Sequence, residues 1–407
     1  MRIAVVSPFL DRQHGTERCI VEQIERFLRE PGCEVHIYAQ TVRDLDVVRY
    51  SGSGSAGEAD GRAVWHRIPL LPGPHLFNFL WWYLANQGLR WFHRTFRSLD
   101  FDVVFSPGIN CADADAIVVH IVFHEFFRLV RDELRLRGTP LRSWPVVLHR
   151  LVYYRLIMAL EKRIYRDRRV AVAAVSGLTA REITKHFGRQ DVRVIQNAVD
   201  LTRFRVEERL KRRAAARETF RFADADFVAL LIGNDWKKKG LSYLLQAVAA
   251  MPDVPVRVLI AGRDDRSPFL DQTRELKIEG QVLFAEPSAD VMQFFAAADV
   301  YAGPSLHDSF ALPPLEAMAC GLAGITSKDN GGAEVITEGC DGFVLNDPRD
   351  SGALAEILRK LYKNPELRQS VGENAARSAQ KLTWERNARE TWEFVSEARR
   401  RKEERAY

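Results

Sequence analysis

The sequence predicts an α/β fold made of two doubly wound parallel sheets. Short β-branched apolar runs alternate with helix-period segments such as Cys19–Leu28, and this alternation is typical of parallel βαβ units. The alternation restarts after a loop-like stretch at 196–200, so two sheets are expected rather than one very wide sheet. The length of 407 residues also fits about two or three domains of roughly 150 residues each.

We place the first domain at 1–195 and the second at 196–380. Residues 381–407 contain no further strand pattern and are predicted to form a highly charged helix. We expect this final helix to cross back and pack on the first domain.

Strands are expected where an apolar run ends in small, polar or turn residues. Those of the first domain are Ile3–Val6, Val35–Tyr38, Val103–Phe105, Ala116–Val119 and Val170–Val175. Those of the second domain are Val228–Ile232, Val256–Ala261, Val282–Ala285, Val300–Ala302, Gly324–Thr326 and Phe343–Leu345. Open α/β sheets bind their ligands at the carboxyl ends of such strands.

The composition, 46% hydrophobic and 28% charged, is that of an ordinary globular protein. No run approaches the roughly 18 apolar residues of a membrane-spanning helix, and the N-terminal residues lack the cleavage site of a signal peptide. The five cysteines form no CxxC pair, which fits a reduced compartment without structural zinc. These features predict a cytoplasmic protein.

The net charge of +5 is concentrated in one segment, because residues 125–169 hold 12 Lys and Arg against five Asp and Glu. Such a segment suggests an anionic partner, namely phosphates, nucleic acid or an acidic membrane surface. Solvated helix faces would explain the same charges.

One string matches a phosphate-binding motif, but the residues around it do not fit that motif. Residues 52–57 spell GxGxxG, but further loop-forming residues follow where a nucleotide-binding helix would have to begin, so we interpret them as a surface loop. The sequence contains no GxxxxGK[ST], HExxH or GxSxG motif, which leaves the commonest NTPase, zinc-protease and hydrolase classes without support.

The most informative segment is 301–336, where an apolar run leads into a loop carrying Asp308. Pro313 and Pro314 then open a helix that contains Glu316. A helix N-terminus at the carboxyl edge of a sheet is a ready anion site. Glu316 could therefore hydrogen-bond a ribose beside a bound phosphate, and Asp308 could accept bonds from sugar hydroxyls. Alternatively, Glu316 only stabilises the helix dipole and Asp308 is an ordinary loop residue.

Three lysines, Lys237, Lys238 and Lys239, follow the first strand of the second domain within the string GNDWKKKG. In a strand-to-helix loop they could neutralise a diphosphate and stabilise the charge on a departing nucleoside diphosphate. The alternative is a solvated lysine run.

The first domain offers two weaker candidates. Gly15 lies in a loop after the first strand, where it would let the backbone approach a ligand. His120 ends a strand at a carboxyl edge, with His124 four residues later, but no third metal ligand has suitable spacing. A purely structural role for His120 is an equal alternative.

Taken together, these motifs resemble the retaining GT-B glycosyltransferases of the family-4 type. Asp308-x7-Glu316 with AMACGL and NGGAEVI resembles the E-x7-E region, and MRIAVVSPF, AVSGLTAREI, VIQNAVDLTRF, KKKG and LIAGRD fit in order. Within this family, GNDWKKKG, AGRDDR and YYRLIMALEKRIYRDRR are most similar to the lipopolysaccharide core glucosyltransferases.

The resemblance implies two facing Rossmann-like domains with a nucleotide-sugar between them. In the second domain, it implies that Glu316 holds the ribose, that Asp308 contacts the donor sugar and that Lys238 and Lys239 bind the diphosphate. The backbone of Phe310, Ala311 and Leu312 would bind phosphate and sugar oxygens. In the first domain, Gly15 would close over the diphosphate and His120 would hydrogen-bond a sugar hydroxyl. Asp308, Thr16, Ala198, Ser309 and Ala311 depart from the usual family pattern. The changes at 308 and 311 put the donor sugar in doubt more than the fold.

The resemblance further implies transfer from a nucleotide-diphosphate-sugar, with a UDP-sugar as the expected donor, to a glycan or lipid-linked acceptor. Neither a metal nor a cofactor is expected, and nucleic acid is not an expected partner. The alternatives are a nucleotide-sugar epimerase on the same scaffold, or a protein that binds anionic membranes or nucleic acid.

Aromatic residues at 77–83, with the basic segment at 125–169, predict reversible binding to the inner face of an anionic membrane. A simple core role for these aromatic residues is the alternative.

Overall fold

The computed structural model describes residues 1–47, 61–134 and 144–406, and it divides into two compact units. The first unit comprises Met1–Gln196 with Glu385–Tyr407, and the second comprises Asn197–Trp384. The expected boundaries were 195/196 and 380/381. The GxGxxG string at 52–57 lies outside the described residues.

The first unit is built on an all-parallel sheet of order β5-β3-β1-β6-β7-β8-β9. Its strands are β1 (Arg2–Val6), β3 (Glu34–Ala39), β5 (Arg62–Arg67), β6 (Val103–Ser106), β7 (Ala116–Val119), β8 (Ala171–Ala174) and β9 (Arg193–Val194). A small second sheet pairs β2 (Phe9–Leu10) with β4 (Thr41–Val42). The order reverses between β1 and β6, which makes the loops after these strands the topological switch point.

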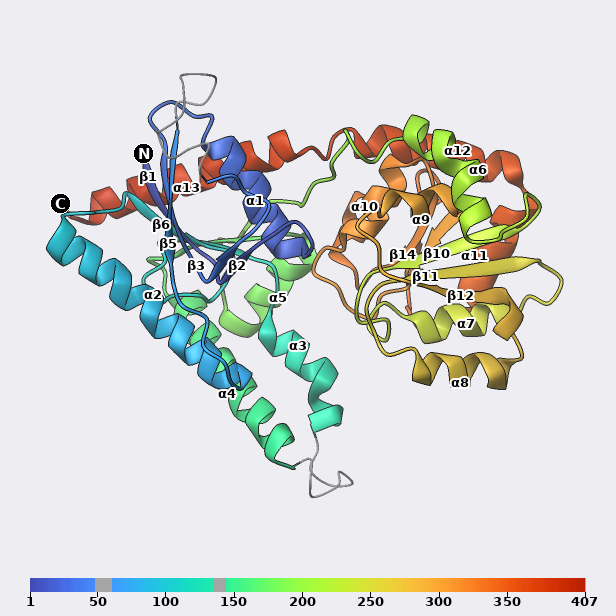
Figure 1. Cartoon of the computed structure of the whole chain (residues 1–407), viewed down its shortest axis with the longest axis horizontal. Coiled ribbons are helices and arrows are strands. Elements are labelled where there is room, and N and C mark those ends of the chain that lie inside the picture. Colours follow the sequence, from blue (N-terminus) through green and yellow to red (C-terminus); the bar gives the residue numbers. More distant parts are fainter. Residues whose placement is uncertain (48–60, 135–143, 407) are drawn as a thin grey trace. The chain divides into compact units, whose positions relative to one another are not determined.

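The helices of this unit are α1 (Gly15–Phe27), α2 (His75–Arg97), α3 (Phe123–Val130), α4 (Trp144–Arg166) and α5 (Gly177–Phe187), with a 3-10 turn at Arg131–Leu134. The long helices α2 and α4 pack against each other, where the rings of Phe79 and Tyr153 lie 5.8 Å apart (Figure 1). Helix α5 begins at a Ser176 cap that accepts the Thr179 N–H, and it ends at Gly188 with φ of +69°.

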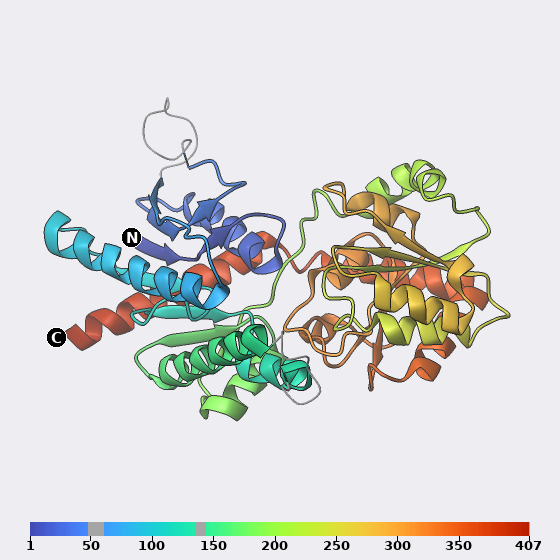
Figure 2. The same ribbon diagram turned by 60° about the horizontal axis from the view of Figure 1, so that its bottom comes forward.

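The final helix α13 (Trp384–Ala406) belongs to the first unit from Glu385 onward and runs there towards the C-terminus (Figure 2). It is tied there through Gln23 Nε2, which donates to Asn387 Oδ1 at 2.9 Å, and through Lys402 Nζ, which lies 2.9 Å from an Asp115 carboxylate oxygen. The expected return of the C-terminal helix to the first domain is therefore confirmed.

The second unit has a parallel sheet of order β12-β11-β10-β13-β14-β15, with its switch point between β10 and β13. Its strands are β10 (Phe227–Ile232), β11 (Val256–Ala261), β12 (Val282–Ala285), β13 (Val300–Ala302), β14 (Ala323–Ser327) and β15 (Phe343–Leu345). Its helices are α6 (Val206–Thr219), α7 (Leu241–Ala249), α8 (Ser267–Leu276), α9 (Met292–Ala297), α10 (Leu312–Ala319), α11 (Ser351–Lys363) and α12 (Pro365–Ala379), with 3-10 turns at Glu279–Gln281 and Gly331–Val335. Figure 1 shows α7 and α8 on one face of this sheet, and α6, α9 and α10 on the other.

The predicted fold class is confirmed, and every expected strand is present within two residues of its predicted ends. The prediction missed β5 and the two-residue strands β2, β4 and β9. β5 (RAVWHR) is an edge strand that mixes charged and aromatic residues, so it has no apolar run to mark it. Central strands such as β10 are buried on both faces and are continuously apolar, which is why they could be predicted.

Candidate functional site

Two loops meet at the switch point of the second sheet. The loop at 233–240 follows β10, and the loop at 303–311 follows the neighbouring strand β13. They are in direct backbone contact, since the Leu306 N–H donates to the Lys238 carbonyl at 2.7 Å. A Cβ on Gly240 would lie 2.0 Å from the Pro304 carbonyl oxygen, and Gly240 has φ of +79°. Only glycine fits there, so the lysine loop is locked against the loop that carries Asp308.

This contact brings Lys239 and Asp308 together. Lys239 Nζ lies 2.6 Å from Asp308 Oδ2, with 13% and 23% of the two side chains exposed. The other carboxylate oxygen of Asp308 accepts the Phe310 N–H at 3.2 Å. Lys238 instead forms an ion pair with Asp235. The sequence placed Lys239 and Asp308 in one site but gave no indication that they pair.

Asn330 is a site residue that the sequence analysis did not single out. It is fully buried, and its Oδ1 accepts the N–H groups of Ala311 and Gly332, at 3.2 and 2.9 Å. Its Nδ2 donates to Thr326 Oγ1 at 3.0 Å. The amide thus fixes the turn that leads into α10. The NGG string of the resemblance contains it, and Asn-Gly is a turn signal that could have drawn attention to it.

The start of α10 offers fewer donors than expected. The Phe310 and Ala311 N–H groups already donate to Asp308 and Asn330, and Pro313 and Pro314 have no N–H. This leaves the Leu312 N–H, at the first residue of α10. Both bonds in the loop are 3.2 Å long, so a bound oxyanion could replace them.

Glu316 lies on the first turns of α10 and is 6% exposed. Tyr301, at the centre of β13, is fully buried, and its hydroxyl has no hydrogen-bond partner among the described residues. Burial, followed by the charges of Asp308 and Glu316, raises the pKa of Tyr301. The phenol therefore stays protonated and can donate a hydrogen bond.

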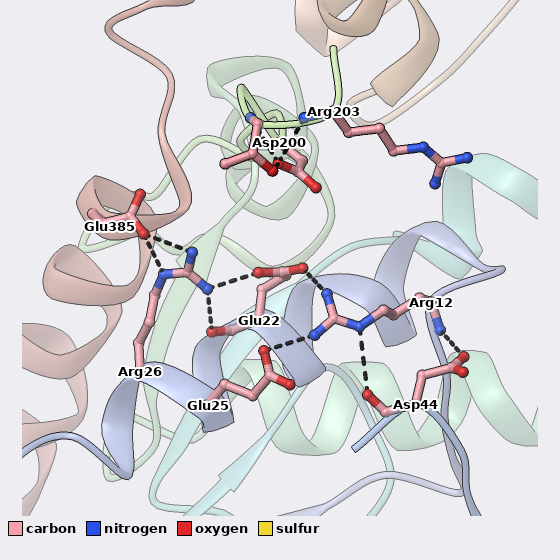
Figure 3. A network of polar contacts seen from close by, with 9 residues as sticks. Arg12, Glu22, Glu25, Arg26, Asp44, Asp200, Arg203 and Glu385 are labelled. Carbon is pink, nitrogen blue, oxygen red and sulfur yellow. Dashed lines mark hydrogen bonds and ion pairs between the residues drawn. The ribbon is translucent and has the colours of Figure 1, made fainter. Parts of the chain in front are cut away.

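In the first unit, Gly15 is the exposed first residue of α1, and side-chain contacts hold the loop before it. The Asp11 carboxylate accepts the N–H groups of Gln13 and His14, at 2.8 and 3.0 Å. Arg12 pairs with the buried Glu22, and its NH2 group lies 2.6 Å from Glu25 on α1 (Figure 3). The N-terminus of α1 is thus positioned before any ligand binds.

His120 follows β7 at the carboxyl edge of the first sheet and is 7% exposed. Its Nε2 atom is buried and has no hydrogen-bond partner among the described residues. Burial lowers the pKa of His120 to about 4, so the ring is neutral near pH 7. A neutral imidazole with an unpaired nitrogen can exchange a hydrogen bond with a ligand hydroxyl.

His124 is not placed with His120 as a metal ligand. Its Nδ1 lies 2.7 Å from a carboxylate oxygen of Glu161, which is fully buried. Within 1–47, 61–134 and 144–406, no three His, Cys, Asp or Glu side chains are grouped so that they could hold a metal ion.

Each half of the chain matches a protein-family model of glycosyltransferases. Residues 14–203 match the model described as "Glycosyltransferase Family 4", and residues 212–378 match "Glycosyl transferases group 1". D-inositol 3-phosphate glycosyltransferase of Corynebacterium urealyticum is 33% identical over 175 residues, which cover 40% of this chain and 41% of that protein. Lipopolysaccharide glucosyltransferase WaaG of Escherichia coli is 29% identical over 149 residues, 36% of this chain and 40% of that protein. The chain therefore spans less than half the length of these two relatives.

Solved structures share the whole fold at low identity. A WaaG crystal structure covers 97% of this chain and 99% of its own, with a TM-score of 0.74 and 18% identity. HepE of Anabaena, solved in complex with UDP-glucose, covers 98% of this chain and all of its own, with a TM-score of 0.67 and 17% identity. These likenesses show the two-domain GT-B fold.

Proposed function

We propose that this chain, which belongs to the group 1 and family 4 glycosyltransferases, moves a hexose from a nucleotide-diphosphate-sugar to a glycan or lipid-linked acceptor with retention of anomeric configuration. The observation that carries the proposal is the Lys239–Asp308 ion pair at the switch point of the second sheet. Lys239 Nζ and Asp308 Oδ2 lie 2.6 Å apart, and in this proposal the lysine binds phosphate while the carboxylate accepts hydrogen bonds from sugar hydroxyls.

In this proposal the second unit binds the donor. Lys239 and Lys238 neutralise the diphosphate, the Leu312 N–H and the N-terminus of α10 bind its oxygens, and Glu316 holds the ribose. Charge that develops on the departing phosphate is stabilised most by donors that are already in place. The loop contacts through Gly240, Leu306 and Asn330 support such preorganisation.

The chemical step we propose breaks the bond between the anomeric carbon and the phosphate oxygen. The acceptor hydroxyl forms the new bond from the same face of the sugar, and its proton passes to the departing phosphate. Positioning and electrostatics then supply the catalysis, with His120 contacting a sugar hydroxyl. No metal and no cofactor takes part in this route, because the lysines and the helix N-terminus supply the positive charge.

A UDP-sugar is the donor we propose, supported by the UDP-glucose complex of a protein with the same fold. A thermal-shift screen of UDP, GDP, ADP and their sugars tests this, since a ligand that binds only the folded protein raises its melting temperature. We expect UDP and a UDP-hexose to give the largest shifts. A larger shift with GDP or ADP would overturn the uridine assignment. An NMR assay of the product's anomeric configuration tests retention.

We further propose that the protein works on the cytoplasmic face of an anionic membrane. No helix in the described part of the chain is long and apolar enough to cross a bilayer. The expected aromatic cluster is divided by the fold, because Trp82 and Tyr83 are core residues whereas Phe77 and Trp81 are exposed. The exposed face continues along α2 through Leu84, Trp91, Phe92 and Phe96.

The charge around this face suits anionic lipid. Residues 61–99 contain no Asp or Glu, and four of their five arginines are exposed, namely Arg62, Arg67, Arg94 and Arg97, whereas Arg90 is buried. Aromatic side chains favour the headgroup boundary, and each basic residue near an anionic surface contributes about 1 kcal/mol. Of the basic residues that the sequence analysis placed at 125–169, those at 135–143 lie outside the described residues.

A further inference from the structure

The start of α3 is anchored by a buried carboxylate on α4. None of the Glu161 side chain is exposed. Its two oxygens accept the backbone N–H groups of Phe123 and His124, at 2.7 and 3.1 Å, and one of them lies 2.7 Å from His124 Nδ1. First-turn N–H groups have no partner within their own helix, and a negative charge there is favourable. Glu161 is thus a side-chain cap for α3 from a different helix.

His120 lies in the short span between this cap and the sheet. On one side, Val119 pairs in register with Ala174 of β8. On the other side, Phe123 is held by Glu161, and the Val122 carbonyl accepts the Phe126 N–H at 3.0 Å. The segment 120–122 therefore has both ends fixed, one by the sheet and the other by the Glu161 carboxylate together with the first turn of α3.

The His120 imidazole in this segment has a ring nitrogen without a hydrogen-bond partner among the described residues. This atom, Nε2, is buried. Leaving a buried polar atom unpaired destabilises a folded protein, and the sugar hydroxyl that the proposed function gives to His120 would supply the missing partner. The benefit of such an arrangement depends on the ring staying where the ligand needs it.

We propose that Glu161 is a positioning residue for sugar transfer, which acts by fixing the His120 span through the start of α3. The proposal rests on the role given above to His120. It adds a residue 41 positions away, on α4, that the sequence did not mark as functional.

A second buried carboxylate provides a matched control. Glu125, in the first turn of α3, pairs with Lys185, and its oxygens lie 2.7 Å from His186 Nε2 and Arg128 Nε. It ties α3 to α5 through side chains and bonds none of the backbone next to His120. Loss of Glu125 should therefore weaken the fold without releasing the His120 span.

The experiment is a double-mutant cycle of Glu161→Gln with His120→Ala, measured in transfer assays of the full chain. A glutamine keeps the shape of Glu161 but not its charge, and we expect kcat to fall about tenfold with the donor KM within about twofold. In the His120→Ala background, the same substitution should change kcat by less than about twofold. Glu125→Gln should lower the melting temperature while leaving kcat near the wild-type value.

The outcomes distinguish a failure of the role proposed for Glu161 from a failure of the role proposed for His120. If Glu161→Gln costs as much activity without His120 as with it, Glu161 acts on the fold in general and the positioning role is wrong. If His120→Ala alone keeps wild-type kcat, the role of His120 itself is wrong. Should Glu161→Gln not fold, His124→Gln removes only the side-chain part of the anchor. The same non-additivity with His120→Ala is then expected, and additive effects would again contradict the proposal.

Discussion

Lys239 and Asp308 form an ion pair across 69 residues of sequence, with Nζ and Oδ2 2.6 Å apart and both side chains largely buried. Each therefore holds the other in place before any donor arrives. A cation that is already ordered reorganises less when phosphate charge develops, and this is the condition under which electrostatic stabilisation is largest.

Lys239→Met should lower kcat by about 10²–10³-fold, equivalent to roughly 3–4 kcal/mol, because it would remove the cation that we propose for the departing diphosphate. Lys239→Arg should recover part of the loss, since it keeps the charge but changes the geometry. Steady-state kinetics with a UDP-hexose measure both. Lys237→Met is the matched control from the same lysine run. A near-wild-type kcat for Lys239→Met would remove the donor-site assignment.

Asp308→Asn should be more damaging than Asp308→Glu. The amide cannot pair with Lys239 and accepts sugar hydroxyl bonds more weakly than a carboxylate does, whereas glutamate preserves both functions with one extra methylene. The measurement is kcat/KM for the donor, together with the melting temperature. Equal kcat/KM values for the two variants would indicate that Asp308 only shapes the loop.

Glu316→Gln should raise the KM for the nucleotide-sugar with a smaller effect on kcat, because the ribose contact that we propose for Glu316 would be made equally before and during the reaction. Calorimetric titration with UDP provides a direct check, and the affinity should fall by about tenfold, as expected for the loss of one hydrogen bond to a charged group. An unchanged affinity for UDP would show that Glu316 serves only the helix.

The sheets could be predicted from the sequence because buried parallel strands such as β10 and β13 are continuous apolar runs. It also marked the loops after those strands. It could not give the Lys239–Asp308 pair or the role of Asn330, because both depend on which strands become neighbours and on the approach of Gly240 to Pro304. The contact between Glu161 and α3 was missed for the same reason, since nothing local to α4 indicates the helix that it caps.

Stability in acid should depend on a buried histidine cluster between α2 and the strands β3 and β5. His66 Nε2 lies 2.8 Å from His36 Nδ1, and Tyr38 shares a 2.7 Å hydrogen bond with His93. Burial, and then the charges of its neighbours, lower the pKa of His66 to about 3. In the unfolded chain, His66 would bind a proton near pH 6.5. The contribution of His66 to the free energy of unfolding is therefore fully present above that pH and is lost as the pH falls towards 3.

We therefore expect the urea midpoint of the wild-type protein to fall between pH 7 and pH 5, and His66→Gln to reduce that fall. His14→Gln is the control, since His14 is exposed. An identical pH dependence in His66→Gln and the wild type would exclude His66 as its source.

The apolar face of α2 should decide whether the protein binds membranes. Phe77, Leu84 and Trp91 follow each other at intervals of seven residues, and each has more than 60% of its surface exposed. Replacing all three by serine should weaken sedimentation with anionic vesicles more than about tenfold, because each large apolar side chain contributes on the order of 1.5–3 kcal/mol when fully buried. High salt should weaken the wild-type interaction as well, since the arginines contribute by charge.

Leu210→Ser, on the exposed surface of α6, is the matched control and should bind as the wild type does. If the wild-type protein stays in the supernatant with anionic vesicles at low salt, the membrane proposal is wrong, and the acceptor is more simply a glycan in solution.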